Sequence, residues 1–353
     1  MNDRVNPVMI SLAREARGLT QIDLAERLHI TQGFLSKMES GHLGVPQETI
    51  YALSDILNFP PNFYFQKYDV YPASMHLYRK HKTLPVKDLN RITAWMNIYR
   101  FHVLHLLQAA DIESELLPEC DVDEFGSAIE VARAVRAAMK LPRGPIENLC
   151  SVLEDWGVVV VPFYPLNRKF QGASMLMERG GYIMLINADM PGDRFRWTLA
   201  HELGHIVMHR IPAADAEKEA DQFAGEFLMP AREIGQYLSE PTLERLASLK
   251  RYWKTSISSI LIQAKNIGAI TENQYRTHVT RLAKEGITRT SEPRELAIPR
   301  EEPTLIKELV EYHTKELGYS NEELADLMVL NIAELMNIYK PPFSGLRVVR
   351  KTG

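Results

Sequence analysis

The chain has 353 residues, enough for about two or three domains, and its 45% hydrophobic and 24% charged content is ordinary for a globular protein. Its net charge of -4 excludes a general attraction to nucleic acid or to anionic membranes, and no apolar run approaches the ~20 residues that span a bilayer. Two cysteines and an N-terminus without a long apolar core predict a cytoplasmic protein with no membrane partner.

Residues 6–65 are predicted to form short helices in quick succession. Thr20 suits the N-cap of a helix over 21–28, and a tight turn leads to a second helix over 32–39. A further helix over 47–57 follows a proline. Two helices joined by a tight turn, the second with a polar outer face, indicate a helix-turn-helix.

This stretch resembles the XRE (lambda-repressor-like) family over about 60 residues. The resemblance is carried by Leu19-Thr20-Gln21, Leu24-Ala25, Ser36 and Glu39-Ser40-Gly41. It implies that base edges are read by Gln32, Gly33, Ser36 and Lys37. It also implies that Thr31 and Gln21 contact the phosphates of a double-stranded DNA operator, and that a homodimer binds two half-sites.

The charge of this module argues against tight DNA binding by one copy. Residues 1–65 hold five Lys or Arg and seven Asp or Glu, whereas affinity for DNA depends largely on neutralising phosphates. Dimerisation, or the basic run Arg79-Lys80-His81-Lys82, could supply the difference. The alternative is a helix-turn-helix kept as a protein-docking module.

Residues 67–145 are predicted to be a helical linker region. From Val86 to Leu116 apolar residues recur at helical spacing, which predicts a long helix that is either a dimer face or the base of the next domain. Amphipathic helices are also predicted over 127–139 and 146–156.

The hydrophobic period then changes to that of a small sheet. Strands are predicted over 158–161, 172–177 and 182–186, the last two joined at Gly180-Gly181 as a hairpin. The segment Gln171 to Met177 is a candidate edge strand for an extended peptide substrate, or a sheet edge with no peptide.

The next predicted helix, 194–209, contains His201-Glu202-Leu203-Gly204-His205. Residues four apart share one helical face, so His201 and His205 can bind one metal ion through their ring nitrogens. Glu202 is then placed to take a proton from water as a general base. The alternative is a buried helix whose histidines are only hydrogen-bonded.

A third ligand is predicted on the following helix, which Pro230 ends. Glu217 is the preferred ligand and Glu219 the alternative, while Asp221, one turn after Glu217, can orient a ligand imidazole. His209 is predicted to support the site or the fold rather than bind metal. Two imidazoles and one carboxylate favour Zn²⁺.

These residues resemble the ImmA/IrrE metallopeptidases over about residues 150–290. The resemblance is carried by His201–His205, Glu217–Ala224 and Leu228-Met229-Pro230. It implies a zincin-like domain that acts as an intracellular protease on a helix-turn-helix repressor. Asp221 departs from the family pattern, in which Asn is common at this position.

Three closing helices are predicted over 243–253, 256–267 and 272–285, before a proline-containing linker. Beyond it, Gly318–Asp326 aligns with Gly18–Glu26 at an offset of 300 residues. This echo predicts a second, degenerate helix-turn-helix at about 303–341, whose neutral or acidic second helix serves docking or sensing.

Together these patterns predict a mostly α fold with a small β-sheet, an α+β class. The expected domains are an XRE-type helix-turn-helix over 1–66, the linker region 67–145, a metallopeptidase domain over 146–290 and a C-terminal helical module over 300–353. The expected function is a transcriptional regulator with a zinc-dependent endopeptidase that cleaves a repressor or partner protein with metal-activated water. The alternative is a DNA-binding regulator or antitoxin whose protease-like domain is a non-catalytic sensor.

Overall fold

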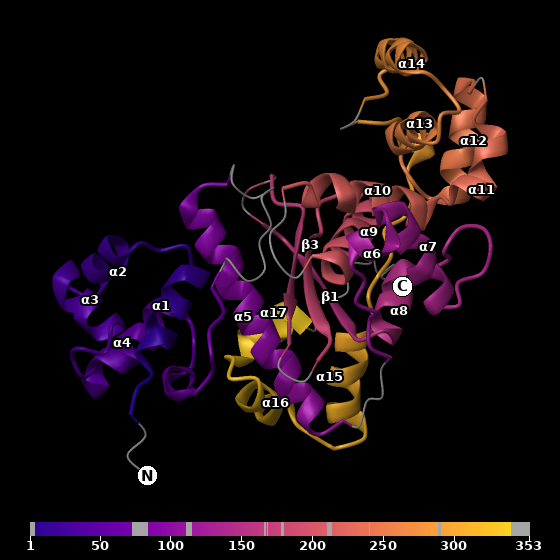
Figure 1. Cartoon of the computed structure of the whole chain (residues 1–353). Coiled ribbons are helices and arrows are strands. Elements are labelled where there is room, and N and C mark those ends of the chain that lie inside the picture. The colour runs from indigo at the N-terminus through magenta and orange to yellow at the C-terminus, as the bar shows by residue number, and fades with distance from the viewer. Residues whose placement is uncertain are drawn as a thin grey trace, which may run out of the picture. The chain divides into compact units, whose positions relative to one another are not determined.

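The computed structural model shows a chain built mainly of helices (Figure 1). It describes residues 4–72, 84–110, 115–165, 167, 169–177, 180–209, 214–239, 241–288 and 291–339. Within these residues there is one sheet, of three strands, so the predicted α+β class is confirmed. No described helix combines the length and apolar character needed to cross a bilayer.

The chain forms two compact units that do not follow its linear order. One unit contains Met1–Ala73, Pro85–Glu113 and Leu305–Gly353, and the other contains Ser74–Leu84 and Ser114–Thr304. The predicted linker region 67–145 is therefore divided between the two units. The basic run Arg79–Lys82 lies outside the described residues.

The first unit begins with the predicted helix-turn-helix. Its elements are α1 (Pro7–Ala16), α2 (Gln21–Arg27), α3 (Gln32–Glu39), α4 (Gln47–Leu57) and the 3-10 helix η1 (Pro61–Phe65). Thr20 caps α2 by accepting from the Asp23 amide, and Asp23 accepts from the Thr20 amide in return. His29 adopts a φ of 56° between the helices, which turns the chain sharply into α3.

Helix α5 (Val86–Gln108) is the central helix of this unit, and it ends before the predicted Leu116. It packs along α1, where the Trp95 indole donates to the Ala16 carbonyl at 3.0 Å. Near its other end, Leu106 is fully buried in a core made by the C-terminal helices. Because one helix enters both cores, the N-terminal helices α1–α4 and the helices of residues 305–339 belong to one unit.

The C-terminal helices are α15 (Leu305–Lys315), α16 (Asn321–Leu327) and α17 (Ile332–Tyr339). Their core consists of Leu309, Val310, Leu324, Ala325, Met328, Leu330 and Leu335 around Leu106. The bounds of α16 and α17 equal those of α2 and α3 plus 300 residues. Local details repeat as well: Ser320 and Glu323 form a capping box, and Gly318 and Val329 have positive φ.

The first turn of α17 packs against the helix-turn-helix module through a bidentate ion pair. The Arg17 guanidinium donates to both carboxylate oxygens of Glu334 at 2.7 Å. Arg17 also donates to the carbonyl oxygens of Leu57 and Asn58, and it lies 4.3 Å from the centre of the Phe59 ring. The contact therefore ties the ends of α1 and α4 to α17.

The second unit carries the sheet and the helices around it. Its elements are α6 (Val122–Phe125), α7 (Ala128–Ala138), α8 (Leu149–Asp155), β1 (Val158–Phe163), β2 (Gly172–Leu176), β3 (Tyr182–Asn187), α9 (Gly192–Met208), α10 (Ala216–Leu228), α11 (Ala231–Ile234), the 3-10 helix η4 (Gly235–Tyr237), α12 (Leu243–Trp253), α13 (Ile257–Asn266), α14 (Glu272–Lys284) and the 3-10 helix η5 (Arg294–Leu296). The strand order is β1-β3-β2. Val160 pairs with Met184 in parallel, and Ser174 pairs with the same residue in antiparallel register.

One continuous core joins the sheet to its helices. Val160 and Met184 of the sheet share this core with Leu199 and Leu203 of α9, and Phe223 of α10 belongs to it too. Helix α9 contacts β2 and β3 on one side and α10 on the other. The sheet and α10 therefore fix α9, the helix that carries the histidine motif.

Candidate metal centre

Helix α9 holds the motif in the interior of the second unit. His201, Glu202 and His205 are 2%, 6% and 1% exposed, although all three are polar. Leu199 and Leu203 on the same helix are fully buried in the core, which fixes the rotation of α9 about its axis. The polar residues are therefore held in place by burial of their apolar neighbours.

Gly204 allows α10 to approach this helix closely. A Cβ added at Gly204 would lie 3.1 Å from Phe223 Cδ1 and 3.3 Å from Ala220 Cα. Even an alanine here would need its neighbours on α10 to shift by a few tenths of an ångström, so the glycine suits the close packing of the two helices. The close crossing brings the first turn of α10, and Glu217 with it, beside the histidines.

Three side chains converge here, and we call them the metal cluster: His201, His205 and Glu217. The two Nε2 atoms are 3.1 Å apart, and the Glu217 carboxylate lies 3.7 Å from His201 Nε2 and 3.5 Å from His205 Nε2. Burial raises the pKa of Glu217, but the two neighbouring imidazoles outweigh burial and hold this pKa well below its usual range.

A second set of polar groups holds the outer nitrogens of the two imidazoles. Asp221 Oδ1 lies 2.8 Å from His201 Nδ1. His205 Nδ1 lies 3.0 Å from His209 Nδ1, and His209 Nε2 lies 2.8 Å from Glu219 Oε2. Glu219, the alternative third ligand, is therefore engaged by His209 rather than placed in the metal cluster.

These partners determine where the protons lie. A carboxylate only accepts, so Asp221 takes a hydrogen from His201 Nδ1 and Glu219 takes one from His209 Nε2. Burial lowers the pKa of His209, against the hydrogen bond to Glu219, so its Nδ1 accepts from His205 Nδ1. Both Nε2 atoms then present lone pairs to the centre of the cluster.

The donor set fits a divalent cation. Two nitrogen lone pairs and a carboxylate repel one another unless a positive charge lies between them. Oε1 of Glu217 is also buried without a hydrogen bond, which is costly for a carboxylate oxygen. Two imidazoles and one carboxylate are the ligands of many catalytic zinc sites, which keep a fourth position open.

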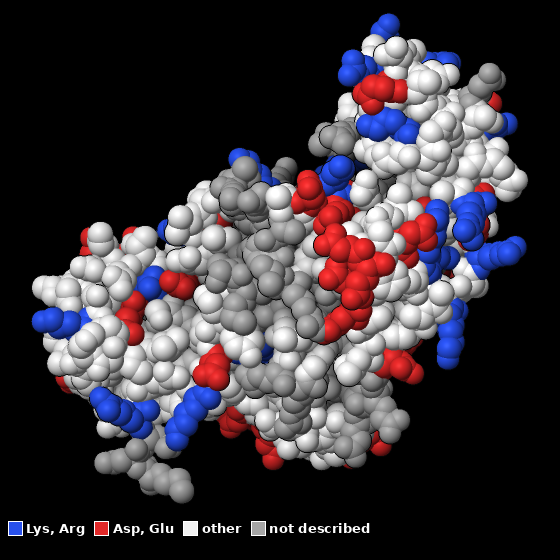
Figure 2. Space-filling view, viewed as in Figure 1, with Lys and Arg blue, Asp and Glu red and all other residues white. Residues whose placement is uncertain are grey.

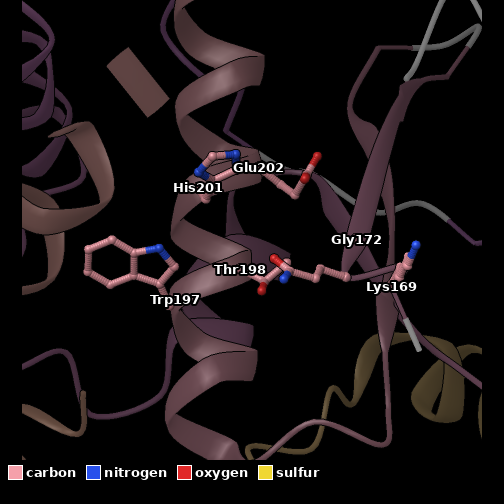
Figure 3. A pocket seen from close by; sticks show the side chains of 7 residues that line it. Lys169, Gly172, Trp197, Thr198, His201 and Glu202 are labelled. Atoms are coloured by element: carbon pink, nitrogen blue, oxygen red, sulfur yellow. The ribbon is translucent and has the colours of Figure 1, made fainter. Parts of the chain in front are cut away.

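Glu202 projects from α9 toward the strand that carries Gly172, and His201 lies on another side of the helix (Figure 3). Ser174 Oγ of β2 donates to Glu202 Oε2 at 3.2 Å. Beside it is a cavity of about 20 Å³ that can hold a water molecule. Its lining comprises Lys169, Gln171, Gly172, Trp197, Thr198, His201 and Glu202.

Gly172 explains how the strand comes so close to Glu202. A Cβ at this position would lie 2.8 Å from Thr198 Cγ2 and 3.4 Å from Glu202 Cγ. The absence of a side chain therefore lets β2 pack directly on α9. Gly172 and Ser174 were predicted only as parts of a strand, because nothing in the local sequence shows what a strand residue faces.

The residues predicted to contact DNA occupy the starts of α2 and α3 in the first unit. Thr31 caps α3 by accepting from the Phe34 amide. Gln32 donates to Gln21 at 2.7 Å, and Gln21 donates to Glu39 at 2.8 Å. A chain of hydrogen bonds thus orients two of the predicted residues.

The other predicted residues lie on the outer side of α3. Gly33 and Lys37 are exposed and Ser36 is partly buried, while Leu35 and Met38 face the core. A Cβ at Gly33 would meet nothing within 4 Å, so this glycine leaves the surface of α3 open. The helix therefore presents a mainly polar outer face to solvent, in which the Phe34 ring is 39% exposed.

The fold and the site define a class of protein: a helix-turn-helix module joined in one chain to a peptidase-type cluster of two histidines and a glutamate. Residues 10–64 match the family described as Helix-turn-helix, and residues 157–265 match the IrrE N-terminal-like domain. The chain thus combines an XRE-type helix-turn-helix with an IrrE/ImmA-like peptidase-family domain, as the resemblances implied. A comparison with curated proteins found no match.

Proposed function

We propose that the chain is a transcriptional regulator whose IrrE/ImmA-like domain is a zinc-dependent endopeptidase. The observation that carries the proposal is the metal cluster, with Glu202 next to it on the same helix. Its substrate is a repressor or partner protein, and a helix-turn-helix repressor is the first candidate. The N-terminal module binds a double-stranded DNA operator as a homodimer.

His201, His205 and Glu217 would hold the zinc ion. Zinc, when bound, supplies Lewis acidity to water and to a peptide carbonyl. The Glu202 carboxylate, oriented by the hydrogen bond from Ser174 Oγ to Oε2, is the base that takes a proton from water. The same carboxylate returns the proton to the amine that leaves.

The peptide substrate is proposed to lie along β2. This strand pairs with β3 on one side only within the described residues, so its other edge can pair with an extended peptide. Gly172 lets the strand lie against α9, so a peptide bound along β2 would lie near Glu202. In this proposal the packing of β2 on α9 orients Glu202 and also brings the bound peptide close to it.

The C-terminal helices are proposed to be a degenerate helix-turn-helix that docks within its own chain. Glu334 of α17 is paired with Arg17 and accepts from Asn58 at 3.2 Å. Asn331 donates to Asn58 at 2.9 Å. The turn that would face DNA in a second DNA-binding module is thus engaged by the first module.

The test compares metal content with cleavage. Purified protein is expected to hold about one zinc per chain, measured by atomic emission. Glu202→Gln should retain the metal and abolish cleavage of the products of neighbouring genes, assayed by gel electrophoresis. Glu244→Gln, on the exposed start of α12, is the matched control and should cleave normally. A preparation that cannot be loaded with zinc would overturn the peptidase.

The same assay distinguishes the peptidase from the alternative, a regulator whose protease-like domain is a non-catalytic sensor. The sensor is favoured if Glu202→Gln and the native chain bind zinc equally, neither cleaves a partner, and the native chain shifts operator DNA.

His209→Asn tests how zinc is held. Loss of a partner of a ligand imidazole typically weakens metal binding about 10- to 100-fold, and we expect a loss of that size here. A zinc affinity unchanged in this variant would contradict the proton arrangement at His205.

A further inference from the structure

A second cavity of about 490 Å³ lies in the second unit and shares no lining residue with the metal cluster. It is formed by the loop after α7, by α11 and η4, and by α12. Its walls include three arginines and three aromatic residues: Arg143, Arg232, Arg245, Tyr237, Tyr252 and Trp253. A cavity of this size matches pockets that hold small molecules, which typically measure about 300–1,000 Å³.

Three arginines against one glutamate give the lining of this cavity a net positive charge. None of the three arginine side chains makes a hydrogen bond or ion pair with another described residue, and all three are exposed. Glu233, the acidic residue of the lining, accepts from the Gly144 amide at 2.6 Å. Lys and Arg also gather on the surface around α11 (Figure 2). The cavity therefore favours an anion.

Other arginines of this unit show the contrast. Arg133 on α7 pairs with Glu226 at 2.7 Å, and Arg136 donates to the Phe227 carbonyl at 2.7 Å. Structural arginines here have partners within the protein. Free guanidinium groups that gather around a cavity are instead available to a ligand.

The aromatic wall provides ring faces from Tyr237 and Tyr252, which are 49% and 57% exposed. The Tyr252 and Trp253 rings meet edge to face, with centroids 5.2 Å apart. Trp253 is 2% exposed, and its indole nitrogen is buried without a hydrogen bond to any described residue. Trp253 therefore backs the wall from the core, and the exposed tyrosine rings are the ones on which a flat ligand can stack.

We propose that this cavity binds a small phosphorylated ligand with a planar ring, of mononucleotide size. The forked guanidinium group matches phosphate oxygens in pairs, and aromatic rings stack on bases. The site would give the second unit a sensor that is independent of the metal cluster. It extends the proposed function by assigning a chemical class to an input signal.

The test is calorimetric titration of the full chain with AMP, and with adenosine and inorganic phosphate as separate probes. AMP should bind about tenfold more tightly than either part alone, because each part makes only some of the contacts. Arg143→Gln and Arg245→Gln should each weaken AMP binding about tenfold or more, the worth of a charged hydrogen bond. Both residues are exposed, so thermal melting should be unchanged.

Arg251→Gln is the matched control, because Arg251 is exposed on the same helix but does not line the cavity. It should bind AMP as the native chain does. Equal losses in Arg251→Gln and Arg245→Gln would overturn the proposal, since they would indicate a general charge effect. So would inorganic phosphate that binds as tightly as AMP, or no AMP binding at millimolar concentration. None of these results depends on zinc or on cleavage.

Discussion

The N-terminal and C-terminal helix pairs of the first unit share one backbone conformation but differ in the residues on their surfaces. Helices α2 and α16, and α3 and α17, coincide in length at an offset of 300 residues. Each pair has a glycine of positive φ before the first helix, at Gly18 and Gly318, and a capping box at its start. Local backbone chemistry is thus sufficient to build the fold twice.

The surfaces differ in the charged residues of the second helix and in their partners. In the N-terminal pair, Arg14 holds Glu39, Glu39 accepts from Gln21, and the outer face of α3 stays in solvent. In the C-terminal pair, α17 has no Lys or Arg, and its Glu334 is bound to Arg17. A helix-turn-helix fold therefore does not by itself fix the role of its second helix: the outer face of α3 stays in solvent, whereas Glu334 of α17 binds Arg17 of the same chain.

The largest expected difference between the pairs is in DNA affinity. Replacing Gln32 and Lys37 together by alanine should weaken operator binding about 10- to 100-fold or more, since a base contact is worth about 1–3 kcal/mol. Ile332→Ala with Asn337→Ala, at the corresponding positions of α17, should leave it unchanged. Fluorescence anisotropy with the DNA upstream of the chain's own gene measures both. Equal losses would mean that both pairs contact DNA.

The ion pair between the modules should give the next largest effect, on stability. Glu334→Ala leaves the Arg17 guanidinium, whose side chain is 22% exposed, without its carboxylate, and should lower the free energy of unfolding by about 1–3 kcal/mol. Denaturant unfolding measures the loss. Glu311→Gln removes an exposed pair with Lys315 and serves as the matched control, with no measurable change expected. A similar result for both variants would indicate that docking through Glu334 adds no stability.

The positive-φ glycines test whether the two backbones are equivalent. Gly18→Ala and Gly318→Ala should each cost about 1–2 kcal/mol, because an L side chain is strained in the left-handed region. Gly318 has nothing within 4 Å of an added Cβ, and at Gly18 the nearest atom, Arg91 Cδ, is 3.5 Å away, so strain dominates at both positions. Thermal melting should show similar shifts. A loss at Gly18 alone would show that the C-terminal turn is not held in this conformation.

Features of short range were predictable from the sequence. The caps at Thr20 and Ser320, the hairpin and the spacing of His201 and His205 each depend on residues a few positions apart, and the helical repeat converts spacing into a shared face. The prediction of Glu217 as a ligand required only the assumption that the next helix lies beside the histidine helix. The α+β class followed from the same local patterns.

Features of long range were not predictable. The pair Arg17–Glu334 joins residues 317 positions apart, and the contact from Ser174 to Glu202 spans 28. Neither contact can be recognised from the neighbouring sequence, because the packing of α5 and of the sheet brings the two residues together. The close approach at Gly172 is of the same kind, since its reason lies on α9. Such contacts require the folded chain.

The capping boxes should give the smallest effect, and one that depends on pH. Hydrogen bonds from the Thr20 backbone amide and then from its side chain hold the pKa of Asp23 below its usual value. A carboxyl whose pKa is lower in the folded state contributes stability above its unfolded pKa of about 3.9, and loses that contribution as the pH falls through the folded value. Asp23→Asn should therefore melt lower than the native chain at neutral pH, with a difference that shrinks in acid. A difference that stays constant across this range would mean that the carboxylate charge is not what stabilises the start of α2, and that the two boxes work through hydrogen bonds alone.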